Sequence, residues 1–157
     1  YSGWLRDAVI DYKNGVRQRV YGLAQVLSSA LLEPRFASSS VLVPVPSSIT
    51  KSAHRGYDTI GALASQCVKL QRERTLEVMP ALYLQREVAD QVGLNAEHRR
   101  ANVLGAMAAR YPVLGNAIVI DDVMTTGSTM REAARALQVA GAQKVFGIAL
   151  CGSPKSG

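Results

Sequence analysis

The C-terminal third of the chain constrains its fold most strongly, because strand, helix and strand patterns follow one another there. Residues 117–120 are apolar and, apart from Ala117, β-branched, which predicts a strand buried on both faces. A helix is predicted next, with Thr129 and Glu132 as a capping box and Gly141 as its C-terminal cap. Residues 144–150 predict a second strand. Because such a βαβ unit joins parallel strands, the sequence predicts an α/β fold with a parallel sheet flanked by helices.

The N-terminal half of the chain adds two helical regions and a strand. Apolar residues at helical spacing predict one or two amphipathic helices in residues 1–33, with Asn14-Gly15 as a candidate break. The apolar run 41–45 predicts a strand, in which Pro44 indicates either an edge strand or a special turn at the strand's end. Apolar spacing also predicts a helix over residues 60–68, capped by Asp58 or Thr59.

The middle of the chain is less regular. The apolar pieces 76–79 and 81–84 are separated by Pro80, and at least one of them is predicted to be a strand. Residues 85–103 are polar and show no clear periodicity, which predicts a long loop. Loops of this length within a compact domain are often functional.

Composition fits one globular domain with an anionic partner. The chain has 157 residues, of which 48% are hydrophobic and 19% charged, and no stretch reaches the roughly 20 apolar residues of a membrane span. The net charge of +6 favours a polyanionic partner, either nucleic acid or a phosphorylated small molecule. Cys67 and Cys151 form no C-x-x-C pair, which predicts no zinc site and two reduced cysteines in a cytoplasmic protein.

The segment VIDDVMTTGSTM, residues 119–130, is unusual because an apolar strand runs into two adjacent acids, Asp121 and Asp122. Small hydroxyl residues and a glycine follow: Thr125, Thr126, Gly127, Ser128 and Thr129. They stand between the carboxyl end of a predicted strand and the start of a helix, where open α/β sheets bind ligands. Free backbone N–H groups and the helix dipole favour an anion there, and glycine allows close approach. This turn therefore predicts binding of a phosphate monoester.

The two acids are explained by a ligand that carries hydroxyls beside its phosphate. A carboxylate accepts hydrogen bonds from vicinal hydroxyls and can help to hold a divalent metal. A ribose 5-phosphate meets both demands. The chain contains neither a Walker loop nor a dinucleotide fingerprint. The alternative is a turn whose Asp and Thr residues only cap a helix, although a cap needs one hydroxyl rather than four.

The same segment closely resembles the phosphoribosyl pyrophosphate (PRPP) signature of type I phosphoribosyltransferases: an apolar run, two acids, two apolar residues and T-T-G-x-T. The resemblance implies a Rossmann-like parallel sheet with a small hood over the site, formed in part by helices of residues 1–33, and a core at residues 41–152. It implies Mg²⁺ as cofactor, held through PRPP with Asp121 and Asp122 as candidate ligands. It also implies displacement of pyrophosphate from C1 of the ribose by a nucleophile.

Further residues resemble the ComF (GntX-like) family of competence proteins within that superfamily. They are Val43-Pro44-Val45-Pro46, His54 to Asp58, Arg86, Gln91, Gly93-Leu94, Arg99, Asn102 and Gly105 to Met107, with Tyr1 to Gly3, Leu5-Arg6 and Tyr12-Lys13 nearer the N-terminus. The family's four-cysteine zinc ribbon is absent from this chain, so zinc binding is not expected. The family is associated with uptake of single-stranded DNA during natural transformation.

The resemblance also implies roles for residues outside the motif. The loop after the first strand is expected to bind pyrophosphate through Val45, Pro46, Ser47, Lys51 and Arg55. The polar excursion resembles a mobile loop that closes over PRPP and excludes water, with Arg86 and Arg99 joining Asp121 and Asp122 as catalytic residues. For each of these cations, a solvated surface charge is the alternative interpretation.

Two kinds of function follow from these observations. The first is an enzyme that transfers a phosphoribosyl group from PRPP to an acceptor that the sequence does not identify. The second is a non-catalytic protein that binds PRPP or handles single-stranded DNA, for which the net charge is suitable. Aromatic residues are only 6% of the chain, so stacking platforms for bases are scarce.

Overall fold

The computed structural model describes residues 3–37, 39–47, 57–71, 74–88 and 101–152. Its helices are α1 (Trp4–Lys13), α2 (Arg19–Leu31), the 3-10 helix η1 (Pro34–Phe36), α4 (Thr59–Leu70) and α6 (Ser128–Val139). Its strands are β1 (Ser39–Pro44), β2 (Glu77–Val78), β3 (Leu82–Leu84), β4 (Met107–Ala109), β5 (Gly115–Met124) and β6 (Ala142–Gly152). None of the helices within these ranges is long and apolar enough to cross a membrane.

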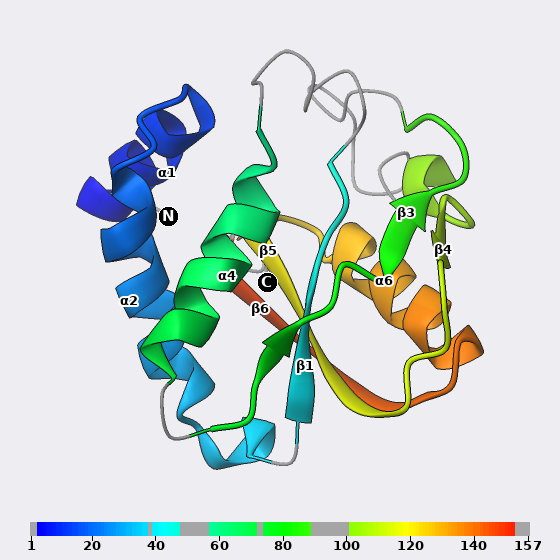
Figure 1. Ribbon diagram of the computed structural model, residues 1–157. Helices are drawn as coiled ribbons and strands as arrows, with labels where there is room; N and C mark the ends of the chain where they lie inside the picture. The colour runs from blue at the N-terminus through cyan, green and yellow to red at the C-terminus, as the bar shows by residue number, and fades with distance from the viewer. Residues whose placement is uncertain (1–2, 38, 48–56, 72–73, 89–100, 153–157) are drawn as a thin grey trace, which may run out of the picture.

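The main sheet is parallel throughout, with strand order β2-β1-β5-β6 (Figure 1). This confirms the predicted α/β fold with a parallel sheet and flanking helices. β1 lies between β2 and β5, which excludes the edge strand, one of the two alternatives that Pro44 indicated. Pro44 is the last residue of β1 and lies opposite Ile120, as the other alternative placed it at the strand's end. β3 and β4 form a separate antiparallel pair. The apolar pieces 76–79 and 81–84 contain β2 and β3, so there is a strand on each side of Pro80.

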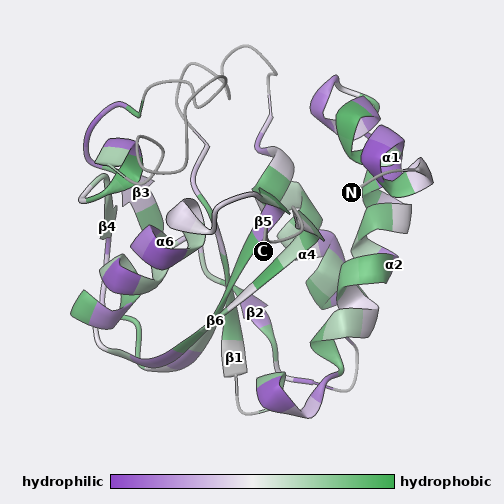
Figure 2. Cartoon of the chain, turned by 180° about the vertical axis from the view of Figure 1, so that it is seen from behind, coloured by the Kyte–Doolittle hydropathy of each residue, from purple (hydrophilic) through white to green (hydrophobic). Residues whose placement is uncertain are grey.

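Hydrophobic clusters on the two faces of the sheet give the molecule three layers. One cluster joins the sheet to α1, α2 and α4, and β5 contributes Ile118 and Ile120 to it. The other joins the sheet to α6 and the β3–β4 pair, and β5 contributes Ala117 and Val119. Figure 2 shows β5 as a hydrophobic strand between the helical layers. Its apolar residues alternate between the two clusters, as the period of a strand requires.

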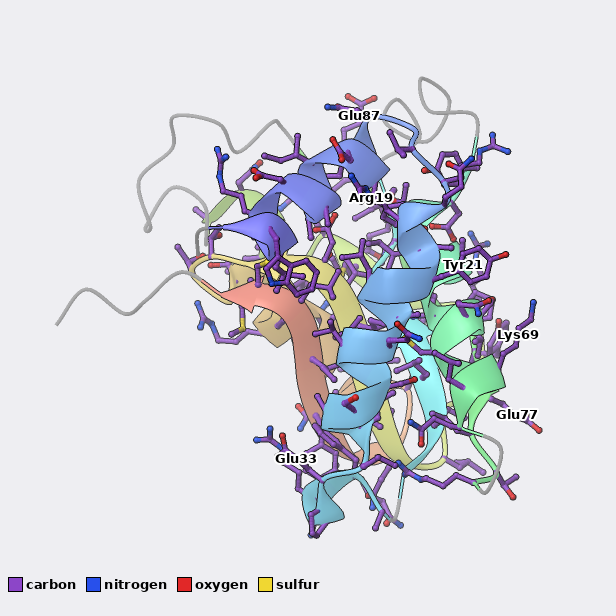
Figure 3. The ribbon with its side chains drawn as sticks, turned by 90° about the vertical axis from the view of Figure 1, so that its left-hand side faces the viewer. Arg19, Tyr21, Glu33, Lys69, Glu77 and Glu87 are labelled. Carbon is purple, nitrogen blue, oxygen red and sulfur yellow. The ribbon has the colours of Figure 1, made fainter. Side chains whose placement is uncertain are left out.

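The N-terminal helices belong to the first of these clusters. The chain turns at Asn14 and Gly15, as predicted, and Gly15 has a φ of 98°, which suits glycine. α2 packs against α4, and Figure 3 shows Lys69 of α4 pointing outward from that contact. α1 lies beside β6 near the carboxyl ends of the strands (Figures 1 and 3). The assignment of these helices to a hood remains a prediction.

The start of α4 is capped as the sequence predicts. Asp58 accepts a hydrogen bond from the backbone N–H of Gly61 at 3.0 Å, from an extended conformation typical of a helix cap. A Cβ atom at position 61 would lie 2.3 Å from Asp58 Oδ2, so glycine there leaves room for the cap.

We expect Asp58→Ala to lower the free energy of unfolding by about 1 kcal/mol, because the N–H of Gly61 loses its acceptor. In a chain of this size, that change lowers the melting temperature by about 2–4 °C, which calorimetry can measure. Asp58→Asn keeps an oxygen acceptor and should cost less than half as much. Equal losses for the two variants would contradict the capping role.

The start of α6 differs from its predicted capping box. Gly127 precedes the helix with a φ of 71°, and the N–H of Ser128, the first helical residue, donates to the hydroxyl of Thr126 at 3.4 Å. Glu132 is 4% exposed and accepts a hydrogen bond from the backbone N–H of Met107 at 3.0 Å. Its carboxylate also accepts hydrogen bonds from Nε and Nη2 of Arg135, each at 2.8 Å. Met107 of β4 and Arg135 one turn later in α6 hold the carboxylate away from the helix start.

Candidate functional site

The carboxyl ends of β1 and β5 lie side by side and bring two sequence motifs together (Figure 1). Beyond the last strand pairing, the N–H of Val45 donates to the carbonyl of Ile120 at 3.0 Å. Pro46 and Ser47, which follow Val45, are half-buried. The start of the predicted pyrophosphate loop is thereby placed beside Asp121. Ligands of open parallel sheets bind at this edge.

The two acids of the motif occupy successive positions near the end of β5. By strand alternation, their Cα–Cβ bonds leave β5 on opposite faces, and Asp122 follows Ile120 toward the α1 side. Asp122 is 8% exposed, whereas Asp121 is half-buried. The carboxylate of Asp121 folds back and accepts a hydrogen bond from the backbone N–H of Asp122 at 2.8 Å. The pair can thus present oxygen acceptors to one ligand from both sides of the strand end.

Burial and the neighbouring charge of Asp122 raise the pKa of Asp121 to about 7. The hydrogen bond from the Asp122 N–H and the positive charge of Lys13 act in the opposite direction but are weaker. A carboxyl group with a raised pKa in a ligand-binding edge is typical of functional sites.

Lys13, the last residue of α1, forms an ion pair with Asp122, and its Nζ lies 2.9 Å from Asp122 Oδ2. The side chain of Lys13 is 34% exposed and that of Asp122 is 11% exposed. Sequence reasoning assigned no role to Lys13. It is more than a hundred positions from Asp122, and no local pattern connects the two residues.

The hydroxyl-rich turn leads from β5 into α6 through Gly127. Its backbone φ of 71° lies in the left-handed region, which favours glycine. The hydroxyls of Thr126 and Ser128 are 2.8 Å apart and form a hydrogen bond. Thr125 is exposed and Thr129 is half-buried, in the first turn of α6, whose N–H groups have no partners within the helix. All five predicted phosphate-binding residues therefore lie at one helix start.

Arg131 is a further cation at this turn that sequence reasoning missed. Its Nη2 donates to Ser128 Oγ at 3.3 Å, and a Cβ atom at Gly127 would lie 3.2 Å from its Nη1. Its position was available from helix geometry, because side chains point toward the helix N-terminus and cover residues three and four positions earlier. The guanidinium adds positive charge beside the predicted phosphate site.

Arg86 lies where the polar excursion, residues 85–103, begins, and it contacts the backbone where the excursion ends. Its Nη2 donates to the carbonyl of Leu104 at 2.7 Å, and its Nη1 donates to that of Glu87 at 3.2 Å. Gln85 also joins the two ends of the excursion, since its side-chain amide donates to the carbonyl of Gly105 at 2.8 Å. These contacts give Arg86 a structural partner in this conformation. Three other predicted site residues lie outside the described residues: Lys51, Arg55 and Arg99.

The site offers oxygen ligands for magnesium. Among the residues that the structure describes, no three His, Cys, Asp or Glu side chains group as a metal site. Mg²⁺ often binds through one or two carboxylates together with substrate phosphates rather than in an all-protein cage. Asp121 and Asp122 fit that arrangement, since both carboxylates lie at the ligand-binding edge beside the predicted phosphate turn.

Comparisons with known proteins leave the function to be argued from the site itself. No family model matches the chain, and no curated protein matches it. Among solved structures it is similar to the glutamine PRPP amidotransferase from B. subtilis complexed with ADP and GMP (17% identity, 83% of this chain, TM-score 0.48). It is also similar to an allosteric regulatory enzyme of purine biosynthesis (19% identity, 84% of this chain, TM-score 0.49). The chain spans 26% of the length of each of these two.

A third similar structure is that of an HPRT glutamic acid mutant, made to study an invariant aspartic acid (13% identity, TM-score 0.44). That similarity covers 91% of this chain and 79% of the HPRT chain. All three TM-scores are below 0.5, so the residues at the edge of the sheet must carry the functional assignment.

Proposed function

We propose that the protein binds PRPP with Mg²⁺ and transfers its phosphoribosyl group to an acceptor, with release of pyrophosphate. One observation carries this proposal: an acid pair and a hydroxyl-rich glycine turn meet at the carboxyl edge of a parallel sheet. The turn provides N–H and O–H donors for the 5-phosphate at the start of α6. Asp121 and Asp122 provide acceptors for the 2′ and 3′ hydroxyls.

This arrangement supports the following proposed roles during the reaction. A nucleophile of the acceptor bonds to C1 of the ribose as the bond between C1 and pyrophosphate breaks, and the electron pair leaves with pyrophosphate. Val45 pairs with Ile120, the residue before Asp121, and we propose that residues 45–47 contact the leaving group, with Lys51 and Arg55 as cationic partners. Mg²⁺ would neutralise charge on the pyrophosphate. Arg86 and Arg99 belong to an excursion that we propose to close over the site and exclude water.

Finer assignments also belong to this proposal. We place the chain in the ComF-like group, because its V-P-V-P run ends β1 at the ligand-binding edge and Lys13 of its Tyr12-Lys13 pair contacts Asp122 of the motif. A link to natural transformation follows from that placement. A cytoplasmic location agrees with Cys67 and Cys151, which are both free and buried.

Calorimetric titration with PRPP and MgCl₂ tests the proposal. We expect the wild-type protein to bind and Asp122→Asn to weaken binding about tenfold or more, since a charge-assisted hydrogen bond is lost. Asp11→Asn is the matched control, because Asp11 is an exposed acid of α1 paired with Arg19. It should bind like the wild type.

Each outcome of this titration has a distinct meaning. Binding followed by pyrophosphate release with a candidate nucleobase supports the transferase. Binding without release for any acceptor tested would overturn transfer and favour a non-catalytic PRPP-binding protein. Absence of binding would overturn the whole proposal, and salt-dependent affinity for single-stranded DNA would then favour the DNA-handling alternative.

A further inference from the structure

The end of α1 is fixed against the elements that surround the candidate site. Tyr12 is 1% exposed, and its hydroxyl donates to the carbonyl of Thr59 at 2.7 Å. The hydroxyl of Tyr57 donates in turn to the carbonyl of Tyr12 at 3.0 Å. The backbone just before Lys13 is therefore held at the start of α4, directly after the segment that includes Lys51 and Arg55.

From this anchored position, Lys13 reaches the second acid of the motif. Its Nζ lies 2.9 Å from Asp122 Oδ2, and this is the one ion pair that the described part of the chain gives Asp122. Lys13 is also the last residue of α1, where a cation interacts favourably with the helix dipole. The dipole explains a cation at this position, but it does not explain why the ammonium turns toward a carboxylate at the ligand-binding edge.

A purely stabilising role accounts poorly for this pair. Desolvation offsets much of the Coulomb attraction in a partly buried ion pair, so apolar residues of similar volume often stabilise a protein equally well. The ammonium engages a single carboxylate oxygen, Oδ2, and thereby limits rotation of the carboxylate. Restricting the orientation of a ligand-binding group is a general way to raise affinity, because less freedom is lost on binding.

We propose that Lys13 is a positioning residue of the PRPP site, which holds Asp122 through Oδ2 so that the other carboxylate oxygen accepts hydrogen bonds from the ribose hydroxyls. This inference rests on the proposed function and adds α1 to the site. It concerns recognition of the sugar rather than of either phosphate group. The affinity for ligands that carry the ribose should therefore depend on Lys13, whereas the affinity for pyrophosphate should not.

Calorimetry with three ligands tests this assignment: PRPP with Mg²⁺, ribose 5-phosphate, and inorganic pyrophosphate with Mg²⁺. We expect Lys13→Met to weaken binding of PRPP and ribose 5-phosphate about tenfold and to change pyrophosphate binding less than twofold. Lys13→Arg, which retains a cation, should recover most of the affinity. Arg19→Met is the matched control, because it removes an exposed ion pair with Asp11 nearby and should change no affinity.

A double-mutant cycle separates positioning from a direct contact with phosphate. If Lys13 acts through Asp122, then Lys13→Met should weaken ribose 5-phosphate binding less than twofold in the Asp122→Asn background. Unchanged affinity in Lys13→Met, equal losses for ribose 5-phosphate and pyrophosphate, or additive losses in the cycle would each overturn the inference. Failure of the wild type to bind PRPP would instead overturn the proposed function.

Discussion

Asp121→Asn is expected to weaken PRPP binding about 10- to 100-fold and, at pH 8, to raise the melting temperature. Affinity falls because an amide replaces a charged acceptor for a ribose hydroxyl, and hydrogen bonds to charged groups contribute about 1.5–3 kcal/mol. Stability rises because the substitution removes a carboxylate that is unfavourable when ionised, being half-buried beside Asp122. Such opposite effects are typical of residues whose placement serves function at the expense of stability.

The direction of the stability change follows from the pKa of Asp121. Its value in the folded protein, about 7, is above its ordinary value of 3.8. Between these values the folded state binds the proton more tightly than the unfolded state does, so stability falls as pH rises through this window. Asparagine has no such dependence. The difference in melting temperature between Asp121→Asn and wild type should therefore grow from pH 5 to pH 8. Each kcal/mol of difference in the free energy of unfolding changes the melting temperature by about 2–4 °C.

Asp122→Asn provides the contrast for this measurement, because it weakens the ion pair with Lys13. It should lower PRPP affinity as Asp121→Asn does. Because the lost ion pair offsets the relief of repulsion with Asp121, it should raise the melting temperature at pH 8 less than Asp121→Asn does. Thermal unfolding of both variants and the wild type at several pH values distinguishes them. A pH-independent difference between Asp121→Asn and wild type would contradict the account of Asp121.

Local patterns predicted the elements of the site, because each is determined by neighbouring residues. The apolar run before Asp121 required a buried strand, and the glycine turn after it required a helix start. The cap at Asp58 was predictable for the same reason, since its acceptor and donor are three positions apart. Parallel pairing of β5 and β6 then followed from the short connection through α6.

Apart from Arg131, whose position helix geometry offered, the features that sequence reasoning missed depend on contacts between distant residues. Lys13 contacts Asp122 only because α1 packs beside β6 at the sheet edge. The capping box did not form because the carboxylate of Glu132 accepts a hydrogen bond from the N–H of Met107, which lies 25 positions away, and is paired with Arg135 one helical turn further on. The interior position of β1 also required knowledge of its partners, since Pro44 alone is compatible with an edge strand or a strand end. A single sequence specifies none of these pairings.

Glu132→Gln is expected to lower the free energy of unfolding by about 2 kcal/mol, within the range measured when buried charged hydrogen-bond partners are removed. Burial opposes ionisation of this carboxylate, but hydrogen bonds from Arg135 and from the backbone N–H of Met107 outweigh it and lower its pKa. The glutamine retains one acceptor, yet it loses the charge that pairs with Arg135. Chemical denaturation at pH 7 measures the difference.

Glu132, Arg135 and the backbone of Met107 form a hydrogen-bonded clamp. It joins α6 to β4, since Arg135 Nη2 donates to the carbonyl of Met107 at 2.8 Å. A group with a lowered pKa contributes stability above its ordinary pKa and loses that contribution as pH falls. The destabilisation caused by Glu132→Gln should therefore shrink in acid. Glu33→Gln is the matched control, because Glu33 is exposed, pairs with Arg35 and should contribute less than about 0.5 kcal/mol. If the two substitutions cost the same, the clamp does not hold β4 to the helix that begins at the phosphate turn.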